Sequence, residues 1–109
     1  NENVVIIDDV LTSATSIITS IELLTQYPVN ILGVVVCVDR QEYGTISHIS
    51  AKQQIEQTYN IPVFSILTIT EIIDFIKNNK IFGKFHLTKY QDLQIQNYLK
   101  QYCILSHHN

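Results

Sequence analysis

The feature that most constrains the fold is an apolar run that leads directly into two acids. Residues 4–7 are Val-Val-Ile-Ile, and Asp8 and Asp9 follow them. A continuous run of β-branched residues predicts a strand that is buried on both faces. The two acids then fall at the carboxyl end of this strand, where open α/β sheets bind their ligands.

Small hydroxyl residues follow the acids, at the point where a helix is expected to begin. They are Thr12, Ser13, Thr15 and Ser16, with Ala14 between them. The free N–H groups of a helix start favour an anion, whereas carboxylates do not bind phosphate directly. One ligand that satisfies both parts is a ribose 5′-phosphate, with the acids on sugar hydroxyls or on a magnesium ion. The simpler alternative is a buried strand whose two acids cap the next helix, and the hydroxyl run in register favours the ligand site.

The chain then alternates between helix and strand patterns. We expect helices over residues 17–27, 50–59 and 70–78, and strands over residues 31–38 and 61–67. Ser50 and Gln53 have the spacing of a capping box, and Thr70 is the predicted N-cap of the third helix. Short connections between such elements predict right-handed crossovers and a parallel sheet.

The C-terminal part has a weaker pattern. Residues 90–102 are expected to form a last helix, with Leu93, Leu99 and Tyr102 as its apolar members, and residues 107–109 a frayed tail. Residues from about 80 onward are therefore expected to be a helical extension of a single domain.

Composition excludes several classes of protein. A chain of 109 residues is at most one domain or part of one, and 46% hydrophobic residues with a mean hydropathy of +0.12 exclude extensive disorder. A net charge of −3 argues against a nucleic-acid interface, and no apolar run is long enough to predict a membrane span. No signal peptide is expected, Cys37 is predicted to be a buried free thiol within a strand, and a reducing cytoplasm is the simplest location.

Two features predict that the chain is the C-terminal half of a longer protein. It contains no Met, and its first strand pattern begins at Asn3 or Val4 with no element before it. We therefore expect further strands beside the first one.

A second polar segment, Asp39-Arg40-Gln41-Glu42, follows the second predicted strand. In a parallel sheet it would lie at the same edge as the two acids of the first strand. The planar fork of donors on Arg40 suits a carboxylate, so one ligand with a ribose phosphate and a carboxylate-bearing base could span both loops. The alternative is a surface ion pair of Arg40 with Asp39 or Glu42.

Residues 4–16 resemble the phosphoribosyl-pyrophosphate motif of the type I phosphoribosyltransferases. The family usually has Gly where this chain has Ala14. The segment 39–42 with Gly44, the start of the next helix at residues 49–51, and residues 59–63, 65–68 and 72–76 narrow the resemblance to orotate phosphoribosyltransferases. The resemblance covers residues 4–78 and implies a three-layer α/β/α fold with a mainly parallel sheet, of which this chain would hold about three strands.

The resemblance implies transfer of ribose 5-phosphate from phosphoribosyl pyrophosphate to orotate in pyrimidine nucleotide synthesis, with Mg²⁺ and as a homodimer. Orotate would contact Thr12 and Arg40, and magnesium would meet the acids only through water. The residues implied to bind phosphoribosyl pyrophosphate are Asp8, Asp9, Val10, Leu11, Thr12, Ser13, Ala14, Thr15 and Ser16. The catalytic basic loop of the family precedes the acidic motif and is absent here, so no catalytic residue is assigned and the fragment alone is expected to be inactive.

Two other classes of protein remain open. A signalling receiver domain also has two acids after its first strand, and Asp39 could be its phosphate acceptor, but the strand ending at Leu67 supplies no Lys. A non-catalytic regulator that keeps the phosphoribosyl-pyrophosphate site is the second. The four His residues lack metal-ligand spacing and are expected at the surface.

Overall fold

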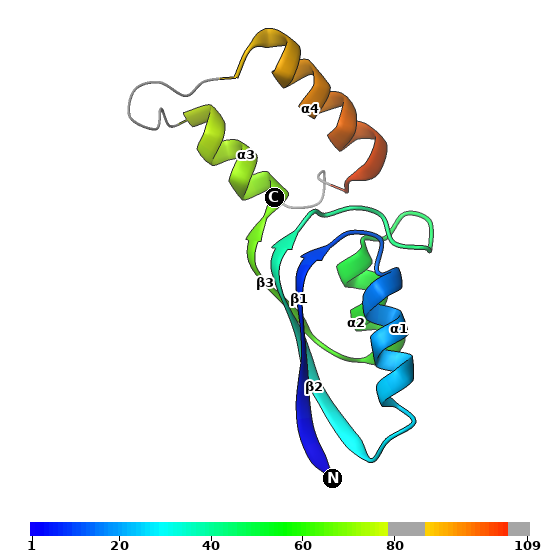
Figure 1. Ribbon diagram of the computed structural model, residues 1–109. Coiled ribbons are helices and arrows are strands. Elements are labelled where there is room, and N and C mark those ends of the chain that lie inside the picture. Colours follow the sequence, from blue (N-terminus) through cyan, green and yellow to red (C-terminus); the bar gives the residue numbers. More distant parts are fainter. Residues whose placement is uncertain (79–86, 105–109) are drawn as a thin grey trace.

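The computed structural model describes residues 1–78 and 87–104, so the predicted tail at 107–109 lies outside the described residues. The elements, in chain order, are β1 (Glu2–Leu11), α1 (Thr15–Leu24), β2 (Val29–Asp39), α2 (Ala51–Tyr59), β3 (Val63–Thr68), α3 (Ile69–Asn78) and α4 (Lys89–Tyr102) (Figure 1). The predicted alternation of strands and helices is therefore confirmed, with boundaries that differ by a few residues.

The three strands form one parallel sheet in the order β1-β2-β3. β2 is the central strand, and its Val34 and Val36 are fully buried. Pairing of β1 with β2 shifts between Val4 and Val5 and then continues to the pair Leu11–Asp39. The parallel arrangement predicted from the short connections is confirmed.

Helices α1 and α2 cover the same face of this sheet (Figure 1). The main core lies between them and the strands. Its members include Ile6, Leu11, Ile17, Ile21, Val34, Val36, Ile55 and Val63. The spacing of four between Ile17 and Ile21 directs both side chains of α1 toward the sheet, as the sequence predicts. Helix α1 ends at Leu24 and leaves Tyr27 exposed beyond it, so the predicted extent to residue 27 is wrong.

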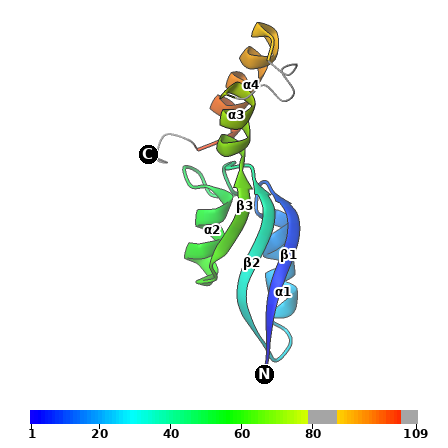
Figure 2. The same ribbon diagram turned by 90° about the vertical axis from the view of Figure 1, so that its left-hand side faces the viewer.

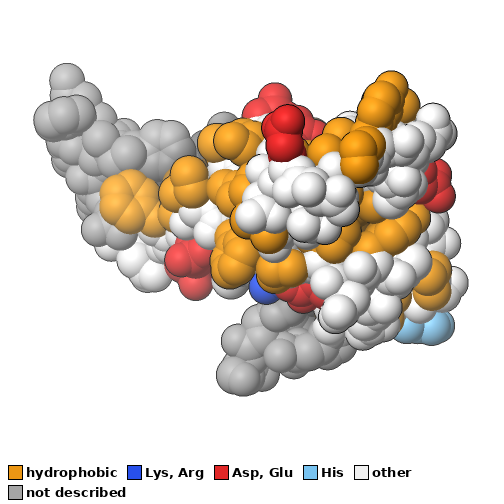
Figure 3. All heavy atoms as spheres, turned by 90° about the horizontal axis from the view of Figure 1, so that it is seen from below, with side chains coloured by type: hydrophobic (Ala, Val, Ile, Leu, Met, Phe, Trp, Pro, Cys, Tyr) orange, Lys and Arg blue, Asp and Glu red, His pale blue; other side chains and the backbone are white. Residues whose placement is uncertain are grey.

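The opposite face of the sheet is uncovered by the described residues (Figure 2). Val5, Phe64 and Cys37 are exposed, and the exposed fraction reaches 79% for Ile7 and 70% for Ile66. Seen from below the view of Figure 1, hydrophobic side chains also lie at the surface of the molecule (Figure 3). The predictions of a first strand buried on both faces and of a buried Cys37 are therefore wrong for the described chain, because both covering helices lie on one side. The structure describes two of the three predicted layers.

Helices α3 and α4 lie beyond the carboxyl ends of the strands and form a second, smaller cluster (Figure 1). Its buried members are Ile73, Leu99 and Cys103, with Ile69, Ile95 and Tyr98 packed against them. Of the predicted apolar members of the last helix, Leu99 is buried, whereas Leu93 and Tyr102 are exposed. The apolar pattern over residues 90–102 is too short and contains too many polar residues to indicate which face of α4 is buried.

The cap of α3 also differs from the prediction. Thr70 lies within the helix, and Thr68 takes the capping role instead. The N–H of Glu71 donates to Thr68 Oγ1 at 3.2 Å, and the N–H of Thr68 donates to Glu71 Oε1 at 2.9 Å. These reciprocal bonds form a capping box two residues earlier than expected. None of the described helices has the length and apolar character needed to cross a membrane.

Candidate functional site

The two acids lie inside β1 rather than beyond it, because the strand continues through Val10 to Leu11. Each carboxylate accepts a bond from the next backbone N–H: Asp8 Oδ1 from Asp9 at 2.8 Å, and Asp9 Oδ1 from Val10 at 2.7 Å. Successive side chains of a strand point to opposite faces. Asp8 therefore lies on the helix-covered face and is half-buried, whereas Asp9 lies on the open face and is exposed.

The loop after β1 leads into α1, and the backbone N–H groups of the first turn of this helix are free to donate. Ala14 is the N-cap residue and provides no side-chain hydrogen bond to the first turn. The N–H groups of Thr15, Ser16 and Ile17 at this end are the donors that a helix leaves unpaired. Ser13 Oγ and Thr15 Oγ1 lie 3.3 Å apart beside them. Backbone N–H groups and hydroxyls thus converge in the arrangement that suits a phosphate group.

Ala14 has a left-handed backbone conformation, with φ 75° and ψ −13°. Only Gly adopts this region without a steric cost, which explains why the resemblance predicts Gly at this position. The Ala14 side chain is buried in the main core. This loop therefore holds its shape with a strained backbone at a core position.

The two loops predicted to share one ligand lie side by side. Leu11 of β1 pairs with Asp39 of β2, and the backbone N–H of Arg40 donates to the carbonyl of Leu11 at 3.1 Å. Thr12 and Arg40, the two residues predicted to contact orotate, are each the next residue after this pair. The structure therefore brings them to the same point at the carboxyl edge of the sheet, as the parallel topology requires.

The guanidinium of Arg40 is held by two side chains. Its Nη2 lies 2.8 Å from Glu42 Oε2, and its Nε and Nη2 donate to Tyr98 Oη at 3.0 and 2.7 Å. Tyr98 Oη in turn donates to Glu42 Oε2, and the Arg40 guanidinium lies 5.4 Å from the centre of the Tyr98 ring. Of the two surface pairs considered from sequence, the one with Glu42 forms, and Asp39 Oδ1 instead accepts from the Gln41 N–H at 2.8 Å.

These contacts shift the pKa values of the group. The hydrogen bond to Tyr98, followed by the charge of Glu42, raises the pKa of Arg40 even though burial opposes it. Burial, and then the hydrogen bond to Glu42, raises the pKa of Tyr98 well above its usual value. Arg40 is therefore a permanent cation next to a tyrosine that stays protonated.

The loop that carries Arg40 is fixed from the C-terminal part of the chain. The Cys103 thiol donates to the Arg40 carbonyl at 3.2 Å, and the Ile104 N–H donates to the Gln41 carbonyl at 2.8 Å. Gln41 itself has a positive φ of 56°, and its side-chain oxygen accepts from the backbone N–H of Thr70 at 3.0 Å. Burial also raises the pKa of the Cys103 thiol, which favours its role as a donor.

Sequence reasoning missed Tyr98. It lies 58 residues after Arg40, on a helix whose apolar face was not recognised. The signal available was the capping box of α4, in which Thr88 accepts from the Gln91 N–H. This cap fixes the start of the helix, but no local pattern indicates which distant loop the helix contacts.

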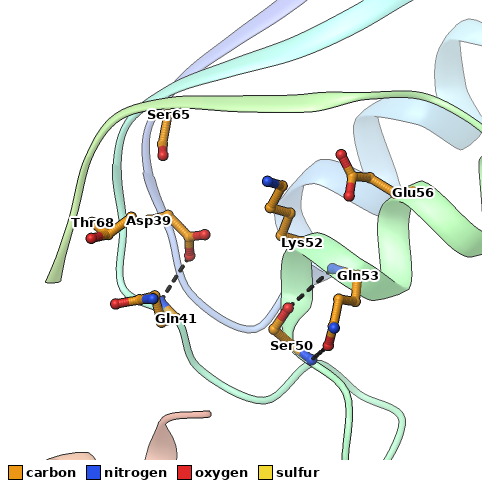
Figure 4. Close-up of a pocket in the computed structure, with 8 residues that line it drawn as sticks. All are labelled: Asp39, Gln41, Ser50, Lys52, Gln53, Glu56, Ser65 and Thr68. Atoms are coloured by element: carbon orange, nitrogen blue, oxygen red, sulfur yellow. Dashed lines mark hydrogen bonds between the residues drawn. The ribbon is translucent and has the colours of Figure 1, made fainter. Parts of the chain in front are cut away.

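A polar cavity of about 360 Å³ lies beside the Arg40 loop (Figure 4). Asp39 and Ser65 point into it from the sheet, and Lys52 and Glu56 point into it from α2. Lys52 and Glu56 share one side of α2 because they are four residues apart. Sequence reasoning did not select this cavity.

Three parallel strands, two acids ahead of a hydroxyl loop and an Arg loop at the next strand end together define part of a type I phosphoribosyltransferase fold. The relatives of the chain agree with this class. The orotate phosphoribosyltransferase of Photorhabdus laumondii is 43% identical over 74 residues, which are 68% of this chain and 34% of that protein. Orotate phosphoribosyltransferase 2 of Saccharomyces cerevisiae is 34% identical over 107 residues, covering 95% of this chain and 44% of that protein.

A solved structure shows the same similarity in three dimensions. The crystal structure of Francisella tularensis orotate phosphoribosyltransferase matches with a TM-score of 0.69 and 32% identity, over 94% of this chain and 47% of that chain. No model of a protein family matches the chain. The chain spans 34% to 44% of the length of these two curated relatives. The predicted resemblance to orotate phosphoribosyltransferases is confirmed, and the chain corresponds to a portion of such a protein.

Proposed function

We propose that the complete protein containing this chain transfers ribose 5-phosphate from phosphoribosyl pyrophosphate to N1 of orotate. The products are orotidine 5′-monophosphate and pyrophosphate, and the reaction belongs to pyrimidine nucleotide synthesis. The observation that carries this proposal is the hydrogen bond of 3.1 Å between the Arg40 N–H and the Leu11 carbonyl, because it joins the start of the phosphate-type loop to the backbone of the loop that carries Arg40. A ligand that contains both a sugar phosphate and a carboxylate fits this combination.

The first loop would hold phosphoribosyl pyrophosphate. Asp8 and Asp9 would accept hydrogen bonds from the ribose hydroxyls, while residues 10–16 would surround the 5′-phosphate with N–H and hydroxyl donors. C1′ becomes cationic as pyrophosphate leaves, so a rigidly held sugar lowers the barrier of the transfer. The strained conformation of Ala14 supports this assignment, since such strain is concentrated at binding loops.

The acids fit a magnesium ion only as a minor part of its shell. Within residues 1–78 and 87–104, no group of three or more His, Cys, Asp or Glu side chains could hold a metal. Magnesium is commonly bound through one or two carboxylates together with water and substrate phosphates. Asp8 and Asp9 can supply the carboxylates of such a shell. When bound, the ion would neutralise the leaving pyrophosphate.

The second loop would recognise the base. Arg40 offers the charge-assisted bond that the orotate carboxylate requires, and Thr12 lies beside it with a hydroxyl. No proton donor for the leaving group is assigned among these residues. We expect the basic catalytic loop in the remaining part of the protein, and the resemblance supports a cytoplasmic homodimer as the assembled form.

The test is a transfer assay with the complete protein, orotate, phosphoribosyl pyrophosphate and Mg²⁺. We expect orotate to be consumed and pyrophosphate to be released in equal amounts. Tight binding of phosphoribosyl pyrophosphate without turnover would instead support a non-catalytic regulator that keeps the phosphoribosyl-pyrophosphate site. An aspartyl phosphate formed from a small phosphodonor, with no nucleotide product, would support the receiver domain.

A further inference from the structure

The side chain that would select the base is held in place by a helix outside the region of family resemblance found in the sequence. Tyr98 of α4 accepts two N–H bonds from Arg40 and donates its own hydroxyl proton to Glu42. The Arg40 side chain is 39% exposed, whereas that of Glu42 is only 14% exposed. The network therefore has a half-buried side made by Tyr98 and Glu42 and a more open side made by Arg40.

This geometry uses only part of the donor capacity of Arg40. Nε and Nη2 are engaged with Tyr98 and Glu42, and within the described part of the chain Nη1 makes no hydrogen bond. A guanidinium presents its donors in one fixed plane. Fixing Nε and Nη2 consequently fixes the direction in which Nη1 can donate.

We propose that Tyr98 is a positioning residue for the base site: it orients the Arg40 guanidinium so that its remaining donors meet the carboxylate of the base. The inference rests on the proposed function and assigns a role to α4 within it. A flexible Arg would lose side-chain entropy when it binds a carboxylate, and Tyr98 removes this loss in advance. The polar aromatic side chain is suited to the task because one hydroxyl both accepts from the cation and donates to Glu42.

The backbone contacts of the same region support this assignment. Glu42 and Cys103 form an isolated antiparallel bridge, and the Cys103 thiol donates to the carbonyl of Arg40 itself. The end of α4 therefore fixes the Arg40 main chain, while Tyr98 fixes its side chain. A helix that served only to bury apolar surface would need neither contact.

The experiment is a kinetic comparison of Tyr98→Phe with the wild type in the complete protein. Phenylalanine retains the ring and removes only the hydroxyl. We expect the Michaelis constant for orotate to rise about three- to tenfold, because the hydroxyl that accepts two N–H bonds from Arg40 and donates to Glu42 is lost, while kcat and the Michaelis constant for phosphoribosyl pyrophosphate stay near wild type. The matched control is Tyr102→Phe, since Tyr102 packs on Tyr98 at 5.4 Å between ring centres but its hydroxyl accepts from Gln101.

A double-mutant cycle separates positioning from a general structural effect. In an Arg40→Ala background, Tyr98→Phe should change the Michaelis constant for orotate less than about twofold, since Arg40, the residue through which Tyr98 acts, is gone. An equal rise in both backgrounds, or an equal rise in Tyr102→Phe, would overturn the inference. An unchanged orotate constant in Tyr98→Phe, with Arg40→Ala clearly impaired, would also overturn it and leave the proposed function intact.

A second variant carries the test if Tyr98→Phe does not fold. Arg40→Lys keeps the charge but cannot make the two N–H bonds to one hydroxyl, so it should weaken orotate binding nearly as much as Arg40→Ala. Wild-type affinity in Arg40→Lys would show that charge alone is sufficient and would overturn the inference. A folded wild-type protein that binds no orotate would overturn the proposed function and this inference with it.

Discussion

The backbone N–H of Arg40 and the carbonyl of Leu11 are joined by a hydrogen bond of 3.1 Å. Neither side chain takes part, so the bond depends only on the parallel register of β1 and β2. It means that the loop after each strand starts at the same level of the sheet. Substitutions in one loop can therefore be tested for their effect on the ligand of the other.

The first prediction concerns the acids of β1. Asp8→Asn with Asp9→Asn, in the complete protein, should reduce transferase activity at least about a hundredfold, because the ribose is no longer held in position for attack at C1′. Both amides can still accept the local bonds from the next N–H, so the fold should persist, as circular dichroism can verify. The control is Asp74→Asn, an exposed acid on α3. Wild-type turnover by the folded double variant would contradict the site assignment.

The second prediction concerns selection of the base. Arg40→Ala should raise the Michaelis constant for orotate about tenfold or more, the value of one charge-assisted bond, with a much smaller effect on phosphoribosyl pyrophosphate. Lys77→Ala is the matched control, since Lys77 also forms an ion pair, at 3.3 Å to Asp92, but lies away from the loops. If orotate kinetics are the same in both variants, the Arg40–Glu42 pair is structural only.

The third prediction concerns the strained loop. Ala14→Gly should raise the free energy of unfolding by about 1 kcal/mol, because Gly adopts φ 75° without the clash that Ala suffers. Affinity for phosphoribosyl pyrophosphate should be preserved or improved, as calorimetric titration with Mg²⁺ would show. The same change at Ala51, an equally buried position within α2, should instead destabilise the protein. Clearly weaker binding by Ala14→Gly would mean that the Ala side chain is itself a fitted part of the loop.

The fourth prediction concerns pH. The pKa of Tyr98 is raised above its usual value, so the folded state binds the phenolic proton more tightly than the unfolded state. The corresponding stability is fully present below a pH of about 10 and is lost as pH rises further toward the folded-state pKa. Thermal unfolding midpoints should therefore fall above this pH in the wild type, and less steeply in Tyr98→Phe. Equal slopes in the two proteins would contradict the network seen around Arg40.

Much of the fold follows from local sequence. The apolar runs at residues 31–38 and 61–67 and the capping box from Ser50 to Gln53 indicate β2, β3 and α2 because strand and cap signals act within a few residues. The adjacency of Thr12 and Arg40 also follows, since parallel topology alone brings successive strand ends together. The positive φ of Ala14 agrees with the Gly that the resemblance predicts there.

The remaining features depend on contacts between distant residues. Cys37 and Ile7 have the composition of buried positions, but their exposure depends on which face of the sheet the helices cover. The partnership of Arg40 with Tyr98 requires α4 to pack on a loop 58 residues away, and no periodicity encodes that distance. Such exposures and long-range contacts depend on how all the elements pack together rather than on a local sequence pattern.

The antiparallel bridge between Glu42 and Cys103 has a consequence for the order of folding. It closes a long loop that contains α2, β3, α3 and α4. Closing a long loop is slow because the chain must lose conformational entropy before its non-local contacts can form. β1, α1 and β2 can assemble from near neighbours, so the phosphate-type loop should form early. The Arg40 loop receives its last contacts only when α4 docks, and it should therefore be the last part of the site to mature during refolding.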